Sequence, residues 1–457
     1  MTPALFADLP RELIEQFDES GSETVSFSPA ASGQRVSTAD YTQSLSALAA
    51  RPEEAVALYV HLPFCPVRCL YCACHTTITH DGERIDRYLD TLEREMDLVT
   101  ARLGRGRTLT QLHLGGGTPN YLTDSQLIRL MEMVGERFHL GPDTATNIEC
   151  NPRRASASQL ELLKGLGFTG VSFGIQDLDV RVQHAIGRVN SLGLVRDVCT
   201  TARETGFECI SLDLVYGLPN QTLASFESTL ERIIEINPDR IRVFGYSHHP
   251  ASRPHQYAIE TACLPGADEK LALLHSAVRC FTESGYTWIG LDCFVRDGDE
   301  LADAQAAGRL RHTALGYTCA PTQHLLAFGA SSLGEVDGTF VQNEPNVDAW
   351  RKAIEDGRFP ILWGHKLNAA DQRRHRAIAH LLCNLELPAS LMSGLAGDAE
   401  RLARCAAQGL IELTDKGLKV THRGRYFLRS LCSQHEPNLA WSNHHWGEPQ
   451  TSGSQTS

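Results

Sequence analysis

Short apolar runs alternate with longer amphipathic stretches from about residue 55 to residue 250 of the chain. Between the first two runs, apolar side chains recur at helical spacing from Ile85 to Leu103, with charged residues on the opposite face. The apolar runs have the length of buried strands. They cover residues 55–61, 108–114, 145–150, 170–175, 208–216 and 240–246. The pattern therefore predicts a strand–helix unit that is repeated along the chain.

Repeated strand–helix units form a parallel sheet with right-handed crossovers. Six units suit an open, partial barrel better than a closed eightfold one, so the sequence predicts an α/β protein with a (β/α)6 TIM-type barrel. In such sheets, ligands bind at the carboxyl ends of the strands. Polar and glycine-rich segments that follow the apolar runs are therefore candidates for the functional site.

The pattern changes near the end of the chain, where charged helical sequence replaces the repeat. Helical stretches at 369–387 and 399–409 precede two short strands joined by Asp415-Lys416-Gly417, an order similar to a winged-helix module. One interpretation is DNA binding, and the other is a structural lid or docking domain. We favour the second, because the expected recognition helix carries only two cations, Arg401 and Arg404.

These patterns divide the chain into five parts. We expect an N-terminal arm, a barrel core, a segment that completes the barrel and its substrate side, a mostly helical winged-helix-like domain, and a disordered tail rich in small and polar residues. In that order, their bounds are 1–50, 51–250, 251–365, 366–432 and 433–457.

Composition restricts the class of protein. The 457 residues, 42% of them hydrophobic, are enough for a large core and one smaller domain. A net charge of −13 without a basic block makes nucleic acid a poor partner. Most of the fourteen cysteines are scattered singly, unlike those of short secreted disulfide scaffolds. The N-terminal sequence resembles neither a signal peptide nor a membrane span, so we expect a cytoplasmic protein without membrane contact.

Four cysteines lie within ten residues, at Cys65, Cys69, Cys72 and Cys74. Iron–sulfur clusters and zinc both prefer thiolate ligands. A zinc site needs a second ligand pair at a compatible spacing, and none follows within thirty residues. We therefore expect Cys65, Cys69 and Cys72 to hold a 4Fe-4S cluster, which leaves one iron open to a cofactor or substrate.

The spacing C-x3-C-x2-C is the signature of the radical S-adenosylmethionine (SAM) superfamily. Tyr59, the lead-in His61-Leu-Pro-Phe64 and the extra Cys74 resemble one family more narrowly, the oxygen-independent coproporphyrinogen III oxidases, or dehydrogenases, of heme synthesis. The resemblance extends over roughly residues 50–430. Its further matching segments are 112–119, 148–149, 172–177, 187–188 and 213–219.

The resemblance implies a reaction. In it, two propionate side chains of coproporphyrinogen III are oxidatively decarboxylated to vinyl groups, which gives protoporphyrinogen IX. A 4Fe-4S cluster and SAM are the implied cofactors, because reductive cleavage of SAM gives a 5'-deoxyadenosyl radical that abstracts hydrogen from the propionate. An electron donor such as flavodoxin or ferredoxin is the implied partner, and we expect a monomer.

The resemblance also implies roles for individual residues. Cys74 lies too close to Cys72 to share the cubane comfortably, so it is either free for substrate or hydrogen-atom chemistry or an incidental small residue, and the resemblance favours the first. Tyr59 is the second implied catalytic residue, and its ring is placed to stack near the methionine group. The implied SAM-binding residues are Tyr59, Tyr71, Gly116, Gly117, Thr118, Glu149, Gln176, Arg188, Asp213, Ser247 and Leu333.

Each of these segments has a physical role if SAM binds. The run Gly115-Gly-Gly117 lets a ligand approach the backbone closely, although a tight turn also explains a glycine run. Glu149 ends a strand and can accept hydrogen bonds from an amine or a ribose. Gln176, Arg188 and Asp213 bring polar groups from later crossovers, and any one of them can equally be a strand-end cap or a surface salt bridge.

Two segments depart from the family. Gly21–Pro29 lacks the arginine and the first tyrosine of the family's G-P-R-Y-T-S-Y-P, which weakens the assignment of a tetra-anionic substrate. Ala314-Leu315 replaces Phe-Gln and makes a second SAM site doubtful. Three interpretations stay open: the dehydrogenase, a related radical SAM enzyme that transfers methyl or methylene groups to another substrate, and a heme-trafficking paralogue. Cys74 favours the first of these, and the altered N-terminal arm favours the second.

Overall fold

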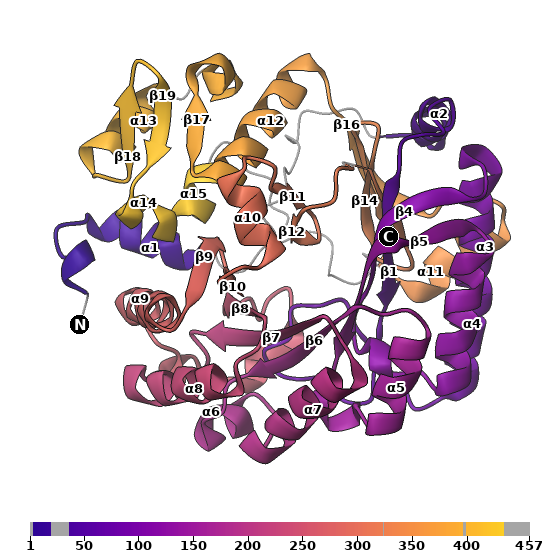
Figure 1. Ribbon diagram of the computed structural model, residues 1–457, viewed down its shortest axis with the longest axis horizontal. Helices are drawn as coiled ribbons and strands as arrows, with labels where there is room; N and C mark the ends of the chain where they lie inside the picture. The colour runs from indigo at the N-terminus through magenta and orange to yellow at the C-terminus, as the bar shows by residue number, and fades with distance from the viewer. Residues whose placement is uncertain (1–2, 20–35, 323, 396–398, 434–457) are drawn as a thin grey trace, which may run out of the picture.

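The computed structural model describes residues 3–19, 36–322, 324–395 and 399–433. A curved sheet of twelve strands forms its centre, and the crossover helices lie along the outer side of the curve (Figure 1). All six predicted runs are strands, and each pairs in parallel with the next along the chain. They are β1 (Val56–Leu62), β4 (Arg107–Gly116), β5 (Phe138–Cys150), β6 (Gly170–Gln176), β7 (Cys209–Tyr216) and β8 (Arg240–Gly245). The predicted α/β partial barrel is confirmed.

The crossover helices follow from the same sequence pattern. The predicted stripe from Ile85 to Leu103 is the buried face of α3 (Gly82–Leu103), which begins where the Asp81 side chain accepts a hydrogen bond from the amide of Glu83. The helices that follow are α4 (Asp124–Gly135), α5 (Ala157–Gly165), α6 (Val180–Ala185), α7 (Leu192–Thr205) and α8 (Leu223–Ile236). Helix α7 ends at Gly206, which takes the left-handed conformation that glycine adopts without strain.

The sheet extends beyond the six units at both edges, which the sequence pattern did not indicate. Beside β1 lies a seventh parallel strand, and antiparallel strands continue from it. These are β13 (Leu325–Phe328), β14 (Leu333–Val336), β15 (Thr339–Asn343) and β16 (Ile361–Lys366). Beside β8 lie β10 (Cys293–Arg296) and β9 (Tyr286–Gly290), flanked by helices α9 (Ala267–Glu283) and α10 (Glu300–Ala306). These strands are short and lack the regular strand–helix alternation.

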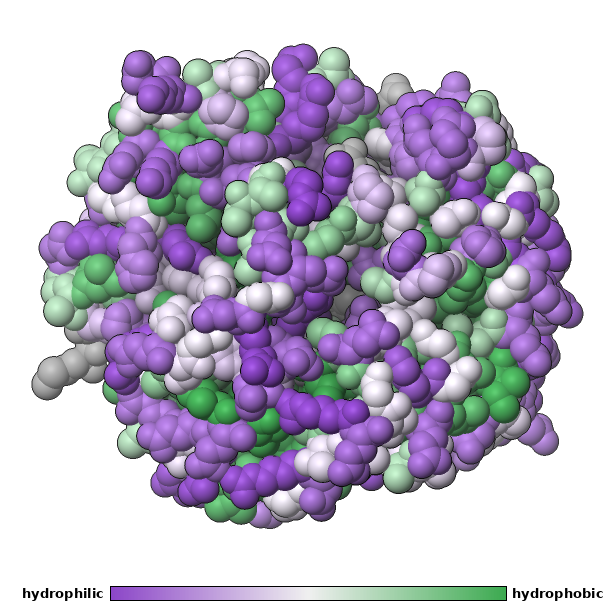
Figure 2. All heavy atoms as spheres, viewed as in Figure 1, coloured by the Kyte–Doolittle hydropathy of each residue, from purple (hydrophilic) through white to green (hydrophobic). Residues whose placement is uncertain are grey.

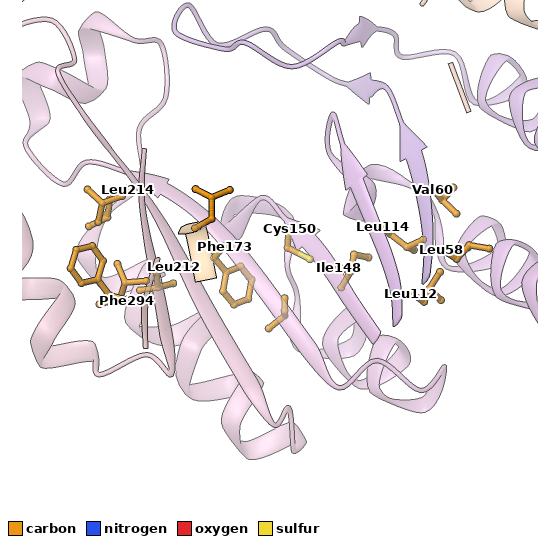
Figure 3. Close-up of a cluster of buried hydrophobic side chains, with 14 of the residues drawn as sticks. Leu58, Val60, Leu112, Leu114, Ile148, Cys150, Phe173, Leu212, Leu214 and Phe294 are labelled. Atoms are coloured by element: carbon orange, nitrogen blue, oxygen red, sulfur yellow. The ribbon is translucent and has the colours of Figure 1, made fainter. Parts of the chain in front are cut away.

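Alternate residues of the strands form the hydrophobic core. Their side chains lie in one layer between the sheet and the crossover helices (Figure 3). The residues labelled there are Leu58, Val60, Leu112, Leu114, Ile148, Cys150, Phe173, Leu212, Leu214 and Phe294. Successive side chains of a strand point to opposite faces, so the residues between them face the inner side of the curve. These inner residues are mostly polar.

The C-terminal part contains a small three-stranded sheet and short helices. Helix α12 (Ala369–Asn384) ends three residues before the predicted boundary, because Leu385 takes a left-handed conformation and β17 (Glu386–Pro388) follows. The predicted hairpin is formed by β18 and β19. The remaining elements are α13 (Ala399–Ala407), β18 (Ile411–Thr414), β19 (Gly417–Val420), α14 (His422–Tyr426) and α15 (Leu428–Ser433).

Contacts of this part favour the docking interpretation. The Arg425 guanidinium lies 4.3 Å from the centre of the Trp288 ring on β9 and donates a hydrogen bond to the Trp288 carbonyl. Arg423 forms an ion pair with Asp8, which precedes helix α1 (Arg11–Glu19). Arg401, expected as a recognition cation, instead donates to the Leu431 carbonyl at 2.6 Å.

Polar side chains cover most of the face shown in Figure 2, and apolar residues appear between them in small groups. Among the residues that the structure describes, no helix is both long and apolar enough to cross a membrane. The predicted domain boundaries stay a prediction, and the predicted tail at 433–457 lies outside the described residues except for Ser433.

Candidate active site

The cysteine loop lies at the carboxyl end of β1. Two very short parallel strands, β2 (Phe64–Cys65) and β3 (Thr77–Ile78), close its base. The end of β4 fastens it, because the Gly117 amide donates to the Leu62 carbonyl at 2.8 Å. A Cβ atom on Gly117 would lie 2.7 Å from the Pro63 carbonyl oxygen. Glycine is therefore required at 117 by the path of the cysteine loop itself.

A buried cation faces the loop thiols. Arg188 is 9% exposed, and its Nη1 donates to the Cys69 Sγ at 3.7 Å while Nη2 donates to the Gly174 carbonyl at 2.7 Å. Its Nε is buried and has no hydrogen-bond partner among the described residues. Cys65 Sγ lies 3.2 Å from the Thr118 hydroxyl. An arginine beside several thiols favours the thiolate form, which is the form that binds metal.

The donor set fits a 4Fe-4S cluster. Only thiols lie at the three predicted ligand positions, and the buried guanidinium of Arg188 provides positive charge and an unused N–H beside them. No three His, Cys, Asp or Glu side chains of the described chain lie as close together as the ligands of a single metal ion do. Cysteines around a cluster bind different iron atoms and do not need that proximity.

Cys74 is exposed and lies beside Cys72. A hydrogen bond from the Cys74 thiol is the main cause that lowers the pKa of Cys72 to about 7, and the charge of Arg188 contributes. The same hydrogen bond raises the pKa of Cys74. Cys74 therefore stays protonated while its neighbour is a thiolate. Its predicted catalytic role remains a prediction.

A fixed chain of hydrogen bonds holds Tyr59 on the inner face of β1. The His61 Nε2 lies 3.0 Å from the His75 carbonyl oxygen, which can only accept, so Nε2 carries the proton. Burial lowers the pKa of His61 to about 4, so its Nδ1 is unprotonated and accepts from the Tyr59 hydroxyl at 3.1 Å. A Cβ atom on Gly116 would lie 2.6 Å from the His61 ring. The glycine at 116 therefore leaves space for this histidine.

Glu149 is the anionic centre of the inner face. Its carboxylate accepts hydrogen bonds from the Gly116 amide and from His113 Nε2, both at 3.1 Å. Burial by itself raises the pKa of Glu149, but the bonds from His113 and Gly116 and the charge of Arg242 outweigh it and lower the pKa to about 2. Glu149 is therefore ionised at neutral pH. The Tyr59 ring stacks on the His113 ring, with centroids 5.9 Å apart.

Asp213 already has a partner within the protein. Arg242, on the neighbouring strand β8, forms a two-point ion pair with it at 2.7 and 3.0 Å. Burial raises the pKa of Asp213, and Arg242 opposes that shift. Arg242 also interacts electrostatically with Glu149. Arg242 and His113 are not among the predicted site residues, although the two-residue period of β8 and β4 places both on the inner face.

The other predicted SAM-binding residues lie around this centre. Gln176 takes a left-handed conformation at the end of β6, and a Cβ atom on Gly174 would meet the side chains of both Gln176 and Arg188. Tyr71 packs on an apolar cluster with Tyr246 and Ile259. Ser247 follows β8. Leu333 on β14 lies opposite Ala327 of β13, which pairs with Tyr59. Their contact with SAM stays a prediction.

The two departures from the family pattern fall in different places. Gly21–Pro29 lies outside the described residues. Ala314-Leu315 forms the turn between β11 (Arg311–Thr313) and β12 (Gly316–Thr318), where the Leu315 amide donates to the Thr313 hydroxyl at 3.1 Å. Tyr317 of this hairpin donates to the Leu382 carbonyl of α12. The two residues of this turn are both apolar, whereas the second of the family's two residues, Gln, is polar.

Known proteins are similar to this chain over most of its length. The radical SAM superfamily model matches residues 59–233. The oxygen-independent coproporphyrinogen III oxidase of Escherichia coli is 36% identical over 85% of this chain and 87% of its own length. The enzyme of the same name from Pseudomonas aeruginosa is 36% identical over 92% and 94%. The solved structure of coproporphyrinogen III oxidase from Escherichia coli, described as a radical SAM enzyme, has a TM-score of 0.84 over 91% of this chain and 96% of that one, at 34% identity.

We expect Cys65→Ala, Cys69→Ala and Cys72→Ala each to lose the cluster, whereas Cys74→Ala keeps it. The reason is that the first three thiols are the predicted ligands and Cys74 is the exposed neighbour of Cys72. Iron and sulfide analysis after anaerobic reconstitution measures this, with roughly four of each per chain expected when the cluster is present. Loss of iron from Cys74→Ala would contradict the three-ligand assignment.

Proposed function

Because the chain belongs to the family of oxygen-independent coproporphyrinogen III oxidases, we propose that it converts coproporphyrinogen III to protoporphyrinogen IX in heme biosynthesis without oxygen. The observation that supports this most is the extent of the similarity. The superfamily model ends at residue 233, but the similarity to these oxidases continues well past it, and one solved oxidase superimposes over 91% of the chain. A shared cofactor domain alone would not reach that far.

The family uses a 4Fe-4S cluster and SAM, and this chain has suitable residues for both. Bound together, they supply a carbon-centred radical that removes a hydrogen atom from the substrate. Cys65, Cys69 and Cys72 would hold the cluster, with Arg188 balancing the charge of the thiolates. Glu149, ionised and held by its two hydrogen bonds, would accept from the ammonium or ribose of SAM.

Each decarboxylation would transfer one hydrogen atom from a propionate to the radical and one electron to a one-electron acceptor, and would release carbon dioxide and leave a vinyl group. The residues around the site keep the reacting groups in place. Tyr59 is held between His61 and His113, and its ring would form one wall of the space beside the cluster. Cys74 carries an exposed, protonated thiol next to the cluster and would face the substrate.

We propose one SAM site per chain. It would lie at Glu149 and Gly116, where polar groups of three neighbouring strands, β1, β4 and β5, converge. The turn at Ala314-Leu315 offers no polar side chain for a second molecule.

We also propose that the enzyme is a cytoplasmic monomer that receives electrons from a flavodoxin or a ferredoxin. Its fourteen cysteines are all free, which fits a reducing compartment. The docked C-terminal part and the net charge of −13 support the absence of nucleic acid from its partners.

The proposed reaction is tested by anaerobic incubation of the reconstituted protein with SAM, dithionite and coproporphyrinogen III. We expect a product lighter by two formic acid equivalents, detected by mass spectrometry after oxidation to the porphyrin, with one or more 5'-deoxyadenosine molecules released for each vinyl group. Cys69→Ala is the matched control and should release none. Release of 5'-deoxyadenosine without any vinyl product would contradict the dehydrogenase and favour a related radical SAM enzyme with another substrate.

We expect the reconstituted protein to bind one SAM per chain in anaerobic equilibrium dialysis with labelled SAM. The control is Ala314→Phe combined with Leu315→Gln, which restores the family's residues and should raise the ratio towards two if that turn decides the second site. A ratio of two in the unaltered protein would contradict the single-site proposal.

A further inference from the structure

The segment that follows β8 carries an arginine, Arg253, with side-chain nitrogens that no described residue pairs with. Arg253 is half-buried, and its Nε and Nη1 are fully enclosed but have no hydrogen-bond partner among the described residues. No ion pair joins its guanidinium to a carboxylate in the part of the chain that the structure describes. Enclosing a charged N–H group without an acceptor is unfavourable, because the group loses its hydrogen bonds to water. The position therefore favours an anion that would accept from one of these nitrogens.

The backbone fixes Arg253 in its place. Its amide donates to the His249 carbonyl at 2.8 Å, and its carbonyl accepts from the Gln256 amide at 2.8 Å. The Gln256 side chain is fully buried and accepts from the His249 amide at 2.6 Å. The segment is therefore braced from both sides of Arg253. These bonds fix the backbone position from which the Arg253 side chain extends.

This segment is joined to the cysteine loop. His255 Nε2 donates to the Cys72 carbonyl at 2.8 Å. Ile259 and Tyr246 form an apolar cluster against which Leu70 and Tyr71 of the loop pack. Arg253 also interacts electrostatically with His255. The unpartnered guanidinium therefore lies at the carboxyl end of the barrel, next to the loop that would hold the cluster, where ligands bind in this type of sheet.

The groups around Arg253 are basic. Arg68 of the cysteine loop and Arg253 both act electrostatically on His255, and Lys270 acts on His248. Lys270 is buried and packs against Gly217 at the end of β7. The charged groups that act on His255 are Arg68 and Arg253, and Lys270 and His249 act on His248. The local field therefore attracts an anion from outside the protein.

We propose that Arg253 is a binding site for one propionate carboxylate of the porphyrinogen substrate. The inference rests on the proposed function, which supplies a substrate with four carboxylates beside the cluster. The Nε and Nη1 hydrogens point to opposite sides of the guanidinium, so the carboxylate would accept a charge-assisted hydrogen bond from one of these two nitrogens. One carboxylate held in this way limits how the ring can turn, so Arg253 would affect which propionate faces the site of hydrogen removal.

The test uses coproporphyrin III, the oxidised ring with the same four propionates, as a stable probe. Its dissociation constant is measured by quenching of tryptophan fluorescence with the reconstituted protein, Arg253→Gln and Arg253→Lys. We expect Arg253→Gln to bind about ten to a hundred times more weakly and Arg253→Lys to fall between. Coproporphyrin III tetramethyl ester, which lacks the charges, should bind the unaltered protein and Arg253→Gln equally.

Arg129→Gln is the matched control variant. Arg129 lies on α4 on the outer side of the barrel and pairs with Asp90 and Glu93. It should bind the probe as the unaltered protein does. Iron content and circular dichroism establish that each variant is folded. If Arg253→Gln does not fold, the weaker binding expected of Arg253→Lys tests the proposal.

Two outcomes would overturn the proposal, and they are distinguishable. Equal affinity of the unaltered protein and Arg253→Gln for coproporphyrin III would reject the carboxylate site and leave the proposed function intact. Failure of the unaltered protein to bind coproporphyrin III and to form a vinyl product would reject the proposed function, and the carboxylate site with it.

Discussion

In the parallel strands of this protein, the side chains that face the helices are apolar and those that face the interior are polar. The cofactor site depends on that separation. Leu58 faces the helices and Tyr59 the interior, and the same alternation gives Ile148 beside Glu149 and Leu212 beside Asp213. A shift of one residue in any of these strands would place a carboxylate or a phenol under the crossover helices and an aliphatic side chain in the site. The burial of the apolar face therefore fixes the register that brings the polar groups together.

The polar face is organised by pairing of charges. Glu149 is held by His113 and the Gly116 amide, and Asp213 by Arg242, which also acts on Glu149. Arg188 lies on the other side, against the cysteine loop, and Arg253 lies beyond it. Negative charge therefore gathers near the proposed SAM site, and positive charge gathers at the thiols and at the loop after β8. A cationic cofactor and an anionic substrate would each meet the opposite charge.

The sequence was sufficient for the regular parts of the fold. The strand runs and the stripe of α3 could be predicted because periodicity of 2 and of 3.6 residues reports burial directly. Strands β13–β16 could not, because they are short and are placed by pairing with β1, a contact far along the chain. The end of α12 was misplaced, since Leu385 adopts a conformation that its residue type does not indicate.

The site was predicted unevenly for similar reasons. The cysteine spacing is local, so Cys65, Cys69 and Cys72 stand out in the sequence alone. The two-residue period of their strands predicts that His113 and Arg242 face the interior. Neither residue belongs to a local motif that marks it as functional. The unpartnered state of Arg253 is a property of tertiary packing, because it depends on which acceptors are absent around it. The side-chain positions of Gly116 and Gly117 face His61 and the Pro63 backbone, a reason for glycine that the sequence did not indicate, and the contact of these glycines with SAM stays a prediction.

The affinity of SAM for Glu149→Gln tests most directly whether the charged inner face forms the cofactor site. The measurement is anaerobic equilibrium binding to reconstituted protein, with Glu132→Gln on the outer helix α4 as control and iron content verified in both variants. We predict that Glu149→Gln weakens SAM binding by about 1 to 3 kcal/mol, since an ionised acceptor is replaced by a neutral amide, while Glu132→Gln has no effect. Unchanged SAM affinity in Glu149→Gln with an intact cluster would contradict the account.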